Sequence, residues 1–322
     1  MSLEPPMTRL VIQIPCFNEA TQLPATLAAL PRTLDGIDRV SWLVVDDGSD
    51  DGTADVARAC GVDDVVRLTR HQGLAQAFTA GLEAALKAGA DIVVHTDADN
   101  QYAAADIPAL IAPIRDGRAD IVVGARPIAD IAHFSTSKKI LQRLGSRVVR
   151  LLSGLDVADA TSGFRAYSRE AALRLSVFDG YTYTLETLIQ AGQQGLAVVS
   201  VPVHVNAPTR ESRLISSTGS YVRRSVLAMA RAFIVYRPLR SIAIPAVIAI
   251  AAGVLLGVRF VWYYWRSGGE AGHVQSLILA SILIVGGLLA GAAAVLADLV
   301  GINRRLLEQL RTEQRRRDWT PR

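Results

Sequence analysis

The segment Ile92-Val-Val-His-Thr-Asp97-Ala-Asp99-Asn-Gln101 decides the fold prediction, because a short apolar run ends in two carboxylates one residue apart. Valine and isoleucine favour a strand, and the polar residues after them indicate a loop at its carboxyl end. Side chains of an extended chain alternate, so Asp97 and Asp99 share a face, and a turn brings Gln101 toward the same point. Oxygen ligands suit Mg²⁺ or Mn²⁺, which keep positions open for phosphate oxygens. The segment predicts a metal site at Asp97, Asp99 and Gln101, although Asp-x-Asp alone also occurs in solvated turns.

Similar apolar runs alternate with helical patterns over residues 1–206. Strands are predicted at Leu10 to Ile14, Trp42 to Val45, Val65 to Leu68, Ile92 to His95, Ile121 to Val123 and Val198 to Val203. Helices are predicted at Gln22 to Leu30, Ala54 to Ala59, Leu74 to Ala88 and Ala103 to Arg115. This alternation predicts an α/β fold with a mostly parallel sheet covered on both faces.

Polar clusters follow three of the predicted strands. They are Pro15 to Glu19 after the first strand, Asp46 to Asp51 after the second and Asp97 to Gln101 after the fourth. Ligands of open α/β sheets bind at the carboxyl ends of the strands. The three clusters are therefore expected to form one site.

Two long apolar runs lie in the last third of the chain. Hydrophobic residues make up 50% of the 322 residues, and they concentrate in Ile242 to Trp265 and Leu277 to Val300. A helix needs about 20 residues to cross the hydrocarbon layer, so two membrane spans are predicted. Buried core helices are the alternative, but the glycines of both runs fit close packing in lipid and also leave a homo-oligomer open: Gly253, Gly257, Gly286, Gly287 and Gly291.

The distribution of arginine predicts the orientation of these spans. Five arginines lie between Arg223 and Arg240, before the first run, and another group lies between Arg304 and Arg317, after the second. The connection from Ser267 to Ser276 contains Glu270 and His273 but no lysine or arginine. The positive-inside rule therefore predicts a multi-pass protein of the cell membrane with both termini cytoplasmic. Residues 1–8 lack the features of a secretory signal.

Composition also excludes some classes of function. Cys16 and Cys60 are the only cysteines, so a disulfide framework and a cysteine-rich zinc site are not expected. The sequence pI of about 9.3 reflects the arginines near the spans, which suit anionic lipid headgroups. No basic stripe with interleaved aromatic residues is present, and a nucleic-acid partner is not expected.

Five motifs, in order and spacing, resemble the inverting glycosyltransferases of family 2. They are Pro15-Cys-Phe-Asn-Glu19, Val44-Val-Asp-Asp-Gly-Ser-Asp-Asp-Gly-Thr53, Gly73 to Gly81, Asp97-Ala-Asp-Asn-Gln101 and Thr161-Ser-Gly-Phe-Arg165. The resemblance covers roughly residues 8–240 and is strongest to the branch that makes polyprenyl-phosphate sugars. It implies a GT-A-like fold, a nucleotide-diphosphate sugar as donor, a polyprenyl phosphate as acceptor and Mg²⁺ or Mn²⁺ as cofactor.

The resemblance also implies roles for single residues. A nucleotide-sugar pocket is implied for Pro15, Phe17, Glu19, Asp46, Asp47, Asp97 and Asp99, with one or both of Asp46 and Asp47 contacting the nucleoside. Phe17 departs from the family, which usually has tyrosine there. The alternative for Asp46 to Ser49 is a capped turn. Catalytic roles are expected for Asp99, Arg126, Arg210 and Glu186, and Glu186 is expected to orient either a helix or a sugar hydroxyl.

An acceptor phosphate is ionised at neutral pH, so its attack on a sugar does not demand a strong base. It demands cations that hold one phosphate near another, and arginine matches phosphate geometry well. The candidate cations are Arg126, Lys138, Lys139, Arg165, Arg210 and Arg213. The resemblance implies that Arg126, Ser162 and Arg210 approach the acceptor phosphate. A structural ion pair is the alternative for Arg165, and a solvated face is the alternative for Lys138 and Lys139.

These predictions divide the chain into four parts. Residues 1–206 form the catalytic domain, and residues 207–240 form an acceptor-binding loop and an amphipathic helix at the membrane surface. Residues 241–302 hold the two spans, and residues 303–322 form a basic cytoplasmic tail. The predicted reaction is sugar transfer from a UDP- or GDP-sugar to undecaprenyl or dolichyl phosphate. Two alternatives are transfer to a hydroxyl acceptor in the membrane and a nucleotide-sugar-binding scaffold without turnover.

Overall fold

The computed structural model describes residues 7–127, 136–177, 183–206, 238–268 and 274–319 and five helical positions between 223 and 236; within 136–145 it describes only the side chain of Leu144. The chain divides into two compact units, residues 1–228 with 309–322 and residues 229–308. The first unit contains the predicted catalytic domain of residues 1–206 and also residues 207–228 and 309–322. The second contains the two predicted spans.

A seven-stranded sheet of order β3-β2-β1-β4-β6-β5-β7 organises the first unit. Its strands are β1 (Arg9–Cys16), β2 (Arg39–Asp46), β3 (Asp64–Arg67), β4 (Ile92–His95), β5 (Ile121–Ala125), β6 (Arg165–Ser168) and β7 (Val198–Pro202). Only β6 runs antiparallel to its neighbours β4 and β5 among these strands. The predicted mostly parallel sheet is confirmed, and each predicted strand is present. The sequence analysis missed β6, whose first residue closes the Thr161 to Arg165 motif.

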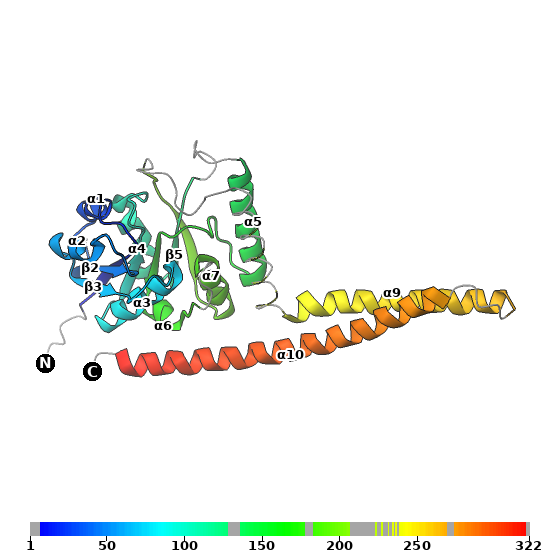
Figure 1. Cartoon of the computed structure of the whole chain (residues 1–322). Helices are drawn as coiled ribbons and strands as arrows, with labels where there is room; N and C mark the ends of the chain where they lie inside the picture. Colours follow the sequence, from blue (N-terminus) through cyan, green and yellow to red (C-terminus); the bar gives the residue numbers. More distant parts are fainter. Residues whose placement is uncertain are drawn as a thin grey trace. The chain divides into compact units, whose positions relative to one another are not determined.

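Helices cover both faces of the sheet (Figure 1). They are α1 (Leu23–Ala29), α2 (Thr53–Ala59), α3 (Leu74–Lys87), the short 3₁₀ helix η1 (Ala104–Asp106), α4 (Ile107–Arg115), α5 (Thr136–Ser153), α6 (Arg169–Arg174) and α7 (Tyr183–Gln193). Along β1, Leu10 and Ile12 pack in the cluster that includes α1 and α4, whereas Val11 packs in the cluster that includes α3, α6 and α7. Burial on both faces explains why this strand is almost continuously apolar.

One edge of the sheet collects all the predicted polar motifs of the described residues. The strands β1, β2, β4 and β5 end there, at Cys16, Asp46, His95 and Ala125. Because β6 is antiparallel and Arg165 lies opposite His95, the loop that precedes β6 reaches the same edge. The antiparallel strand therefore brings residues 159–163 beside Asp97.

The second unit contains two helices that are long and apolar enough to cross a membrane, α9 (Pro238–Arg266) and α10 (Val274–Trp319). The most apolar windows have mean hydropathies of 2.4 and 2.5. Their backbones approach closely at two glycines, since a Cβ on Gly253 would lie 2.8 Å from the Ala280 oxygen and one on Gly287 would lie 2.9 Å from the Ala246 oxygen. The predicted small-residue packing is confirmed at Gly253 and Gly287. Gly257, Gly286 and Gly291 have open space instead.

The end of α10 packs against the catalytic domain. The side chain of Arg315 is 7% exposed and donates to a Glu83 carboxylate oxygen at 2.6 Å and to the Leu175 carbonyl at 3.0 Å. Arg316 pairs with Glu170 at 2.6 Å, and Trp319 packs against the cluster that includes α3. The helix thus continues beyond the span predicted to end at Val300, and residues 309–319 belong to the catalytic unit instead of forming a separate tail.

We expect Arg315→Ala to lower the free energy of unfolding of the catalytic domain by about 1.5–3 kcal/mol, since a charged hydrogen bond is lost in a buried place. The matched control is Arg317→Ala, which removes the same charge from an exposed position of the same helix, and which should change stability by less than about 0.5 kcal/mol. Thermal unfolding of both purified variants in one detergent measures the difference. Equal effects would contradict a specific contact at Arg315.

Candidate active site

The loop after β4 holds Asp97 and Asp99 at the carboxyl edge. Asn100 has a positive φ of 55°, and the Gln101 amide donates to Asp99 Oδ1 at 3.1 Å. Asn206 stabilises this turn, because its backbone amide donates to the Gln101 carbonyl at 2.8 Å and its side-chain amide donates to the Asn100 carbonyl at 2.9 Å. The turn is thus fixed on two sides.

The electrostatics of the aspartate pair fit a divalent cation. Burial and then the charge of Asp99 raise the pKa of Asp97 to about 7, although 35% of the Asp97 side chain is exposed. Two carboxylates that repel each other are stabilised by a cation between them. Among the described residues, no group of three or more His, Cys, Asp and Glu side chains lies together for a metal. A metal held by Asp97 and Asp99 would therefore take its other oxygens from water or substrate phosphates, as Mg²⁺ usually does. Gln101 is half-buried on the same turn.

Arg126 follows β5 at the same edge of the sheet as Asp97. Its guanidinium forms a two-bonded ion pair with Asp159, with Nε at 2.7 Å from Oδ2 and Nη2 at 3.1 Å from Oδ1, and it also donates to Thr161 Oγ1 at 2.9 Å. The charge of Arg126 lowers the pKa of Asp97, so the guanidinium and this carboxylate interact electrostatically. The site therefore pairs two carboxylates with one arginine that is held in place.

The motif after β2 both caps a turn and borders the site. Asp46 accepts from the Ser49 amide at 2.9 Å, as predicted for a capped turn, and its other oxygen lies 3.4 Å from Arg67 Nε. Asp47 accepts from the Gln72 and Gly73 amides, each at 2.8 Å, and lies 2.8 Å from His71 Nδ1. Asp47 is thus engaged in holding the segment that leads into α3. Of the two residues, Asp46 is therefore the better candidate for the predicted nucleoside contact.

The motif after β1 lies next to this turn. Phe17 is 38% exposed and stacks on His71, with ring centroids 3.8 Å apart. Pro15 is buried in β1, and Glu19 is 8% exposed with its backbone amide bonded to Thr53 Oγ1 at 3.0 Å. The charge of Glu19 also raises the pKa of Asp97. An exposed aromatic face and a nearby acidic group are consistent with the predicted nucleoside pocket.

The prediction that Arg165 contacts the acceptor phosphate is wrong. Arg165 is fully buried, and its guanidinium donates to four acceptors within the protein: the Ser162, Thr184 and Ala160 carbonyls at 2.8 Å and Thr187 Oγ1 at 2.9 Å. It stabilises the loop before β6 through carbonyl oxygens, so the alternative of a structural ion pair does not hold either. Ser162 is also fully buried, and its role at the acceptor phosphate stays a prediction.

Glu186 lies on α7, is 6% exposed and has the amide of Gln190 at 3.5 Å, which favours the helix-orienting alternative. Arg210 and Arg213 lie outside the described residues, as does the side chain of Lys138, and their roles stay predictions. The sequence analysis missed Asp159, Tyr183 and His95 as site residues. Their signal in the sequence was weak, because each contacts its partners only through the fold.

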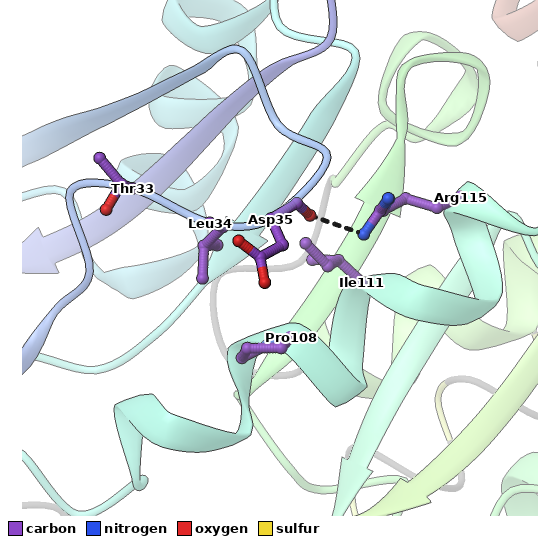
Figure 2. A pocket seen from close by; sticks show the side chains of 6 residues that line it. All are labelled: Thr33, Leu34, Asp35, Pro108, Ile111 and Arg115. Atoms are coloured by element: carbon purple, nitrogen blue, oxygen red, sulfur yellow. Dashed lines mark hydrogen bonds between the residues drawn. The ribbon is translucent and has the colours of Figure 1, made fainter.

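A pocket of about 350 Å³ lies elsewhere on the domain. Figure 2 shows its lining, in which Arg115 donates to the Asp35 carbonyl at 2.9 Å. Residues 33–35 precede β2 and Arg115 ends α4 before β5, so the pocket lies at the amino edge of the sheet. It is therefore separate from the aspartate site.

Comparison with known proteins agrees with this geometry. Residues 11–175 match the family Glycosyl transferase family 2. The undecaprenyl-phosphate mannosyltransferase of Micrococcus luteus is 32% identical over 69% of this chain and 93% of its own length. The polyprenol monophosphomannose synthase of Mycolicibacterium smegmatis is 30% identical over 70% of this chain and 87% of its own length.

Solved structures share the fold. Glucosyl-3-phosphoglycerate synthase from Mycobacterium tuberculosis, crystallised with Mn²⁺, UDP and glucosyl-3-phosphoglycerate, superposes with a TM-score of 0.54 at 24% identity, over 69% of this chain and 80% of that one. Mannosyl-3-phosphoglycerate synthase from Rubrobacter xylanophilus gives a TM-score of 0.53 at 19% identity, over 70% of this chain and 74% of that one. At these identities the likeness shows a GT-A-like fold and no more. Together with the two relatives, the sheet topology and the aspartate loop show that this chain is an enzyme of glycosyltransferase family 2 and belongs to its polyprenyl-phosphate glycosyltransferase branch.

Proposed function

We propose that the enzyme transfers a sugar, with mannose as the first candidate, from a nucleotide-diphosphate sugar to a polyprenyl phosphate, with inversion at the anomeric carbon. The observation that carries this proposal is the meeting of Asp97, Asp99 and Arg126 at one edge of the sheet. Two like charges that need a cation and one fixed arginine that attracts an anion suit a reaction between two phosphate-bearing substrates. The mannose assignment is carried over from the names of the two relatives.

On the donor side, Asp97 and Asp99 would hold Mg²⁺ or Mn²⁺, with Gln101 assisting. When bound, such an ion neutralises charge on the departing nucleotide diphosphate. Phe17 would face the base and Asp46 would accept a hydrogen bond from it, because Phe17 is exposed and Asp46 lies on the neighbouring strand end. These residues would bind and orient the donor.

On the acceptor side, Arg126 would hold the attacking phosphate. Its ion pair with Asp159 fixes one edge of the guanidinium, and 14% of the side chain remains exposed. Arg210 and Arg213 are proposed to add further positive charge. Because a phosphate oxyanion is already ionised, no base is assigned, and Glu186 is left to orient α7. The helices α9 and α10 would keep the domain at the cytoplasmic face of the cell membrane, where a lipid acceptor lies.

The remaining alternative is a membrane acceptor with a hydroxyl in place of the phosphate. It would require a base near Arg126 to remove a proton, whereas the groups hydrogen-bonded to that arginine are an ion-paired carboxylate and a threonine. The scaffold alternative is set aside, since the chain belongs to a family of enzymes.

A transfer assay on the purified full-length protein tests the proposal. GDP-mannose and UDP-glucose are each offered with Mn²⁺ to undecaprenyl phosphate or to undecaprenol, which has the same lipid and a hydroxyl. Product is expected with the phosphate and not with the alcohol, and EDTA is expected to abolish it. Transfer to the alcohol alone would favour the hydroxyl acceptor and refute the proposed one.

Mn²⁺ binding is expected to depend on pH through Asp97. Its raised pKa of about 7 means that a proton competes with the cation below neutrality. The ionised fraction falls about tenfold between pH 8 and pH 6, so the affinity for Mn²⁺ should fall by about the same factor. A titration of Mn²⁺ without nucleotide, followed by electron paramagnetic resonance, measures this. In Asp97→Asn the affinity should be weak and independent of pH over the same range, and an unchanged pH dependence would contradict the assignment.

A further inference from the structure

We propose that Tyr183 is a positioning residue for the metal-binding carboxylate Asp97, with its hydroxyl oriented by His95 and Gln13. This inference rests on the proposed metal role of Asp97 and assigns buried residues that support that carboxylate. Buried partners of this kind commonly tune the residues that hold a metal.

The geometry is a chain of three buried polar side chains. Gln13 Nε2 lies 3.0 Å from His95 Nδ1, and His95 Nε2 lies 3.0 Å from the Tyr183 hydroxyl. Gln13 is 1% exposed, His95 is fully buried and Tyr183 is 5% exposed, and the rings of His95 and Tyr183 both pack against Phe78. Asp97 Oδ1 is 3.9 Å from His95 Nε2. This row of hydrogen-bonded side chains therefore lies next to Asp97.

The direction of the hydrogen bonds follows from the amide of Gln13. Its Oε1 lies against Gly81, where a Cβ would be only 2.4 Å away, and an oxygen suits this place better than an NH₂ group that would find no acceptor there. Nε2 thus donates to His95 Nδ1. Because its Nδ1 accepts this hydrogen bond, the buried His95 ring carries no proton there. Its one proton lies on Nε2 and is donated to the Tyr183 oxygen.

Because the Tyr183 oxygen accepts from His95, its own proton is available to another acceptor. A Cβ added to Gly163 would lie 3.2 Å from Asp97 Oδ2 and 3.3 Å from the Tyr183 hydroxyl oxygen, so the two groups border the same small space. Burial and then the charge of Asp97 raise the pKa of Tyr183. A hydroxyl dipole aimed at this carboxylate favours its ionised form and limits its rotation.

Tyr183→Phe tests the proposal, because it keeps the ring and removes only the hydroxyl. The dissociation constant of Mn²⁺, measured by electron paramagnetic resonance on the full chain in detergent at pH 8, should rise about tenfold. At saturating Mn²⁺ the kcat of sugar transfer should return to within about twofold of wild type, since the variant weakens metal binding without removing a reacting group.

Tyr167→Phe is the matched control. Tyr167 is fully buried and packs against the same Phe78, but its pKa is raised by burial and lowered by Arg165, with no contribution from Asp97. Its affinity for Mn²⁺ should stay at the wild-type value. An unchanged affinity in Tyr183→Phe, or equal losses in both variants, would overturn the proposal. The titration uses neither donor nor acceptor, so a wild-type enzyme that binds Mn²⁺ but does not modify polyprenyl phosphate would count only against the proposed function.

Discussion

Asp99→Ala should reduce sugar transfer by about 10³-fold or more, equivalent to about 4 kcal/mol of transition-state stabilisation. Asp99 is half-buried on the turn after β4, and its charge is one of the two that would hold the cation. Removing it leaves Asp97 as the one carboxylate proposed to bind the metal. Initial rates at saturating donor, acceptor and Mn²⁺ measure the effect.

Asp99→Asn separates charge from loop structure. The amide oxygen can still accept the hydrogen bond from the Gln101 amide that Asp99 Oδ1 accepts at 3.1 Å, so the turn should persist. Its activity is nevertheless expected to fall nearly as far as in the alanine variant, because neutral oxygens hold Mg²⁺ and Mn²⁺ weakly. Asp116→Asn, on a surface side chain that is 54% exposed, controls for the substitution itself. Wild-type activity in Asp99→Asn would contradict the metal role.

Asp159→Ala should destabilise the catalytic domain by about 3–5 kcal/mol, because it leaves the guanidinium of Arg126 buried without its partner. The side chains of the pair are 14% and 2% exposed, so Nε would lose its carboxylate acceptor and Nη2 would keep only Thr161 Oγ1. The charge of Arg126 and its hydrogen bond lower the pKa of Asp159 against the effect of burial. The pair therefore stabilises the fold above the ordinary aspartate pKa, and the stabilisation is lost as pH falls through the lowered value.

Thermal unfolding of the purified protein, followed by tryptophan fluorescence at neutral pH, measures the effect of Asp159→Ala. Asp116→Ala is the matched control, since it breaks an exposed ion pair with Arg118 and should cost less than about 1 kcal/mol. Transfer activity of Asp159→Ala at a temperature where it stays folded should also fall, because Arg126 loses the partner that fixes its position. Equal stability of the two variants would contradict the importance of the buried pair.

The central sheet could be predicted from sequence because its signals are local. Each strand in residues 1–206 except β6 is a short run rich in valine or isoleucine, and these strands are predicted correctly. Strand β6 begins at Arg165, and an arginine followed by Ala166 and Tyr167 does not look like a buried strand. Its position between β4 and β5 is set by pairing with two strands that are distant in sequence.

The arginines show the same division. Arg126 and Arg165 are both predicted from sequence to contact phosphate. The burial of each side chain depends on the pairing of β6. This pairing places Arg165 under the loop of residues 160–162, whereas Arg126 stays at the edge of the sheet. Local pattern does not contain that information.

The sequence alone determined the alternation of strands and helices, the gathering of Asp46, Asp97 and their neighbours at the carboxyl edge, and the two apolar helices. These depend on periodicity and on hydrophobic length, which are properties of consecutive residues. Only the tertiary structure decided that Arg165 is buried, that Asp159 holds Arg126, that Tyr183 stands behind Asp97, and that Arg315 near the end of α10 returns to the catalytic domain. Each of these depends on which residues far apart in the chain are brought into contact, and the packing of the whole fold settles that.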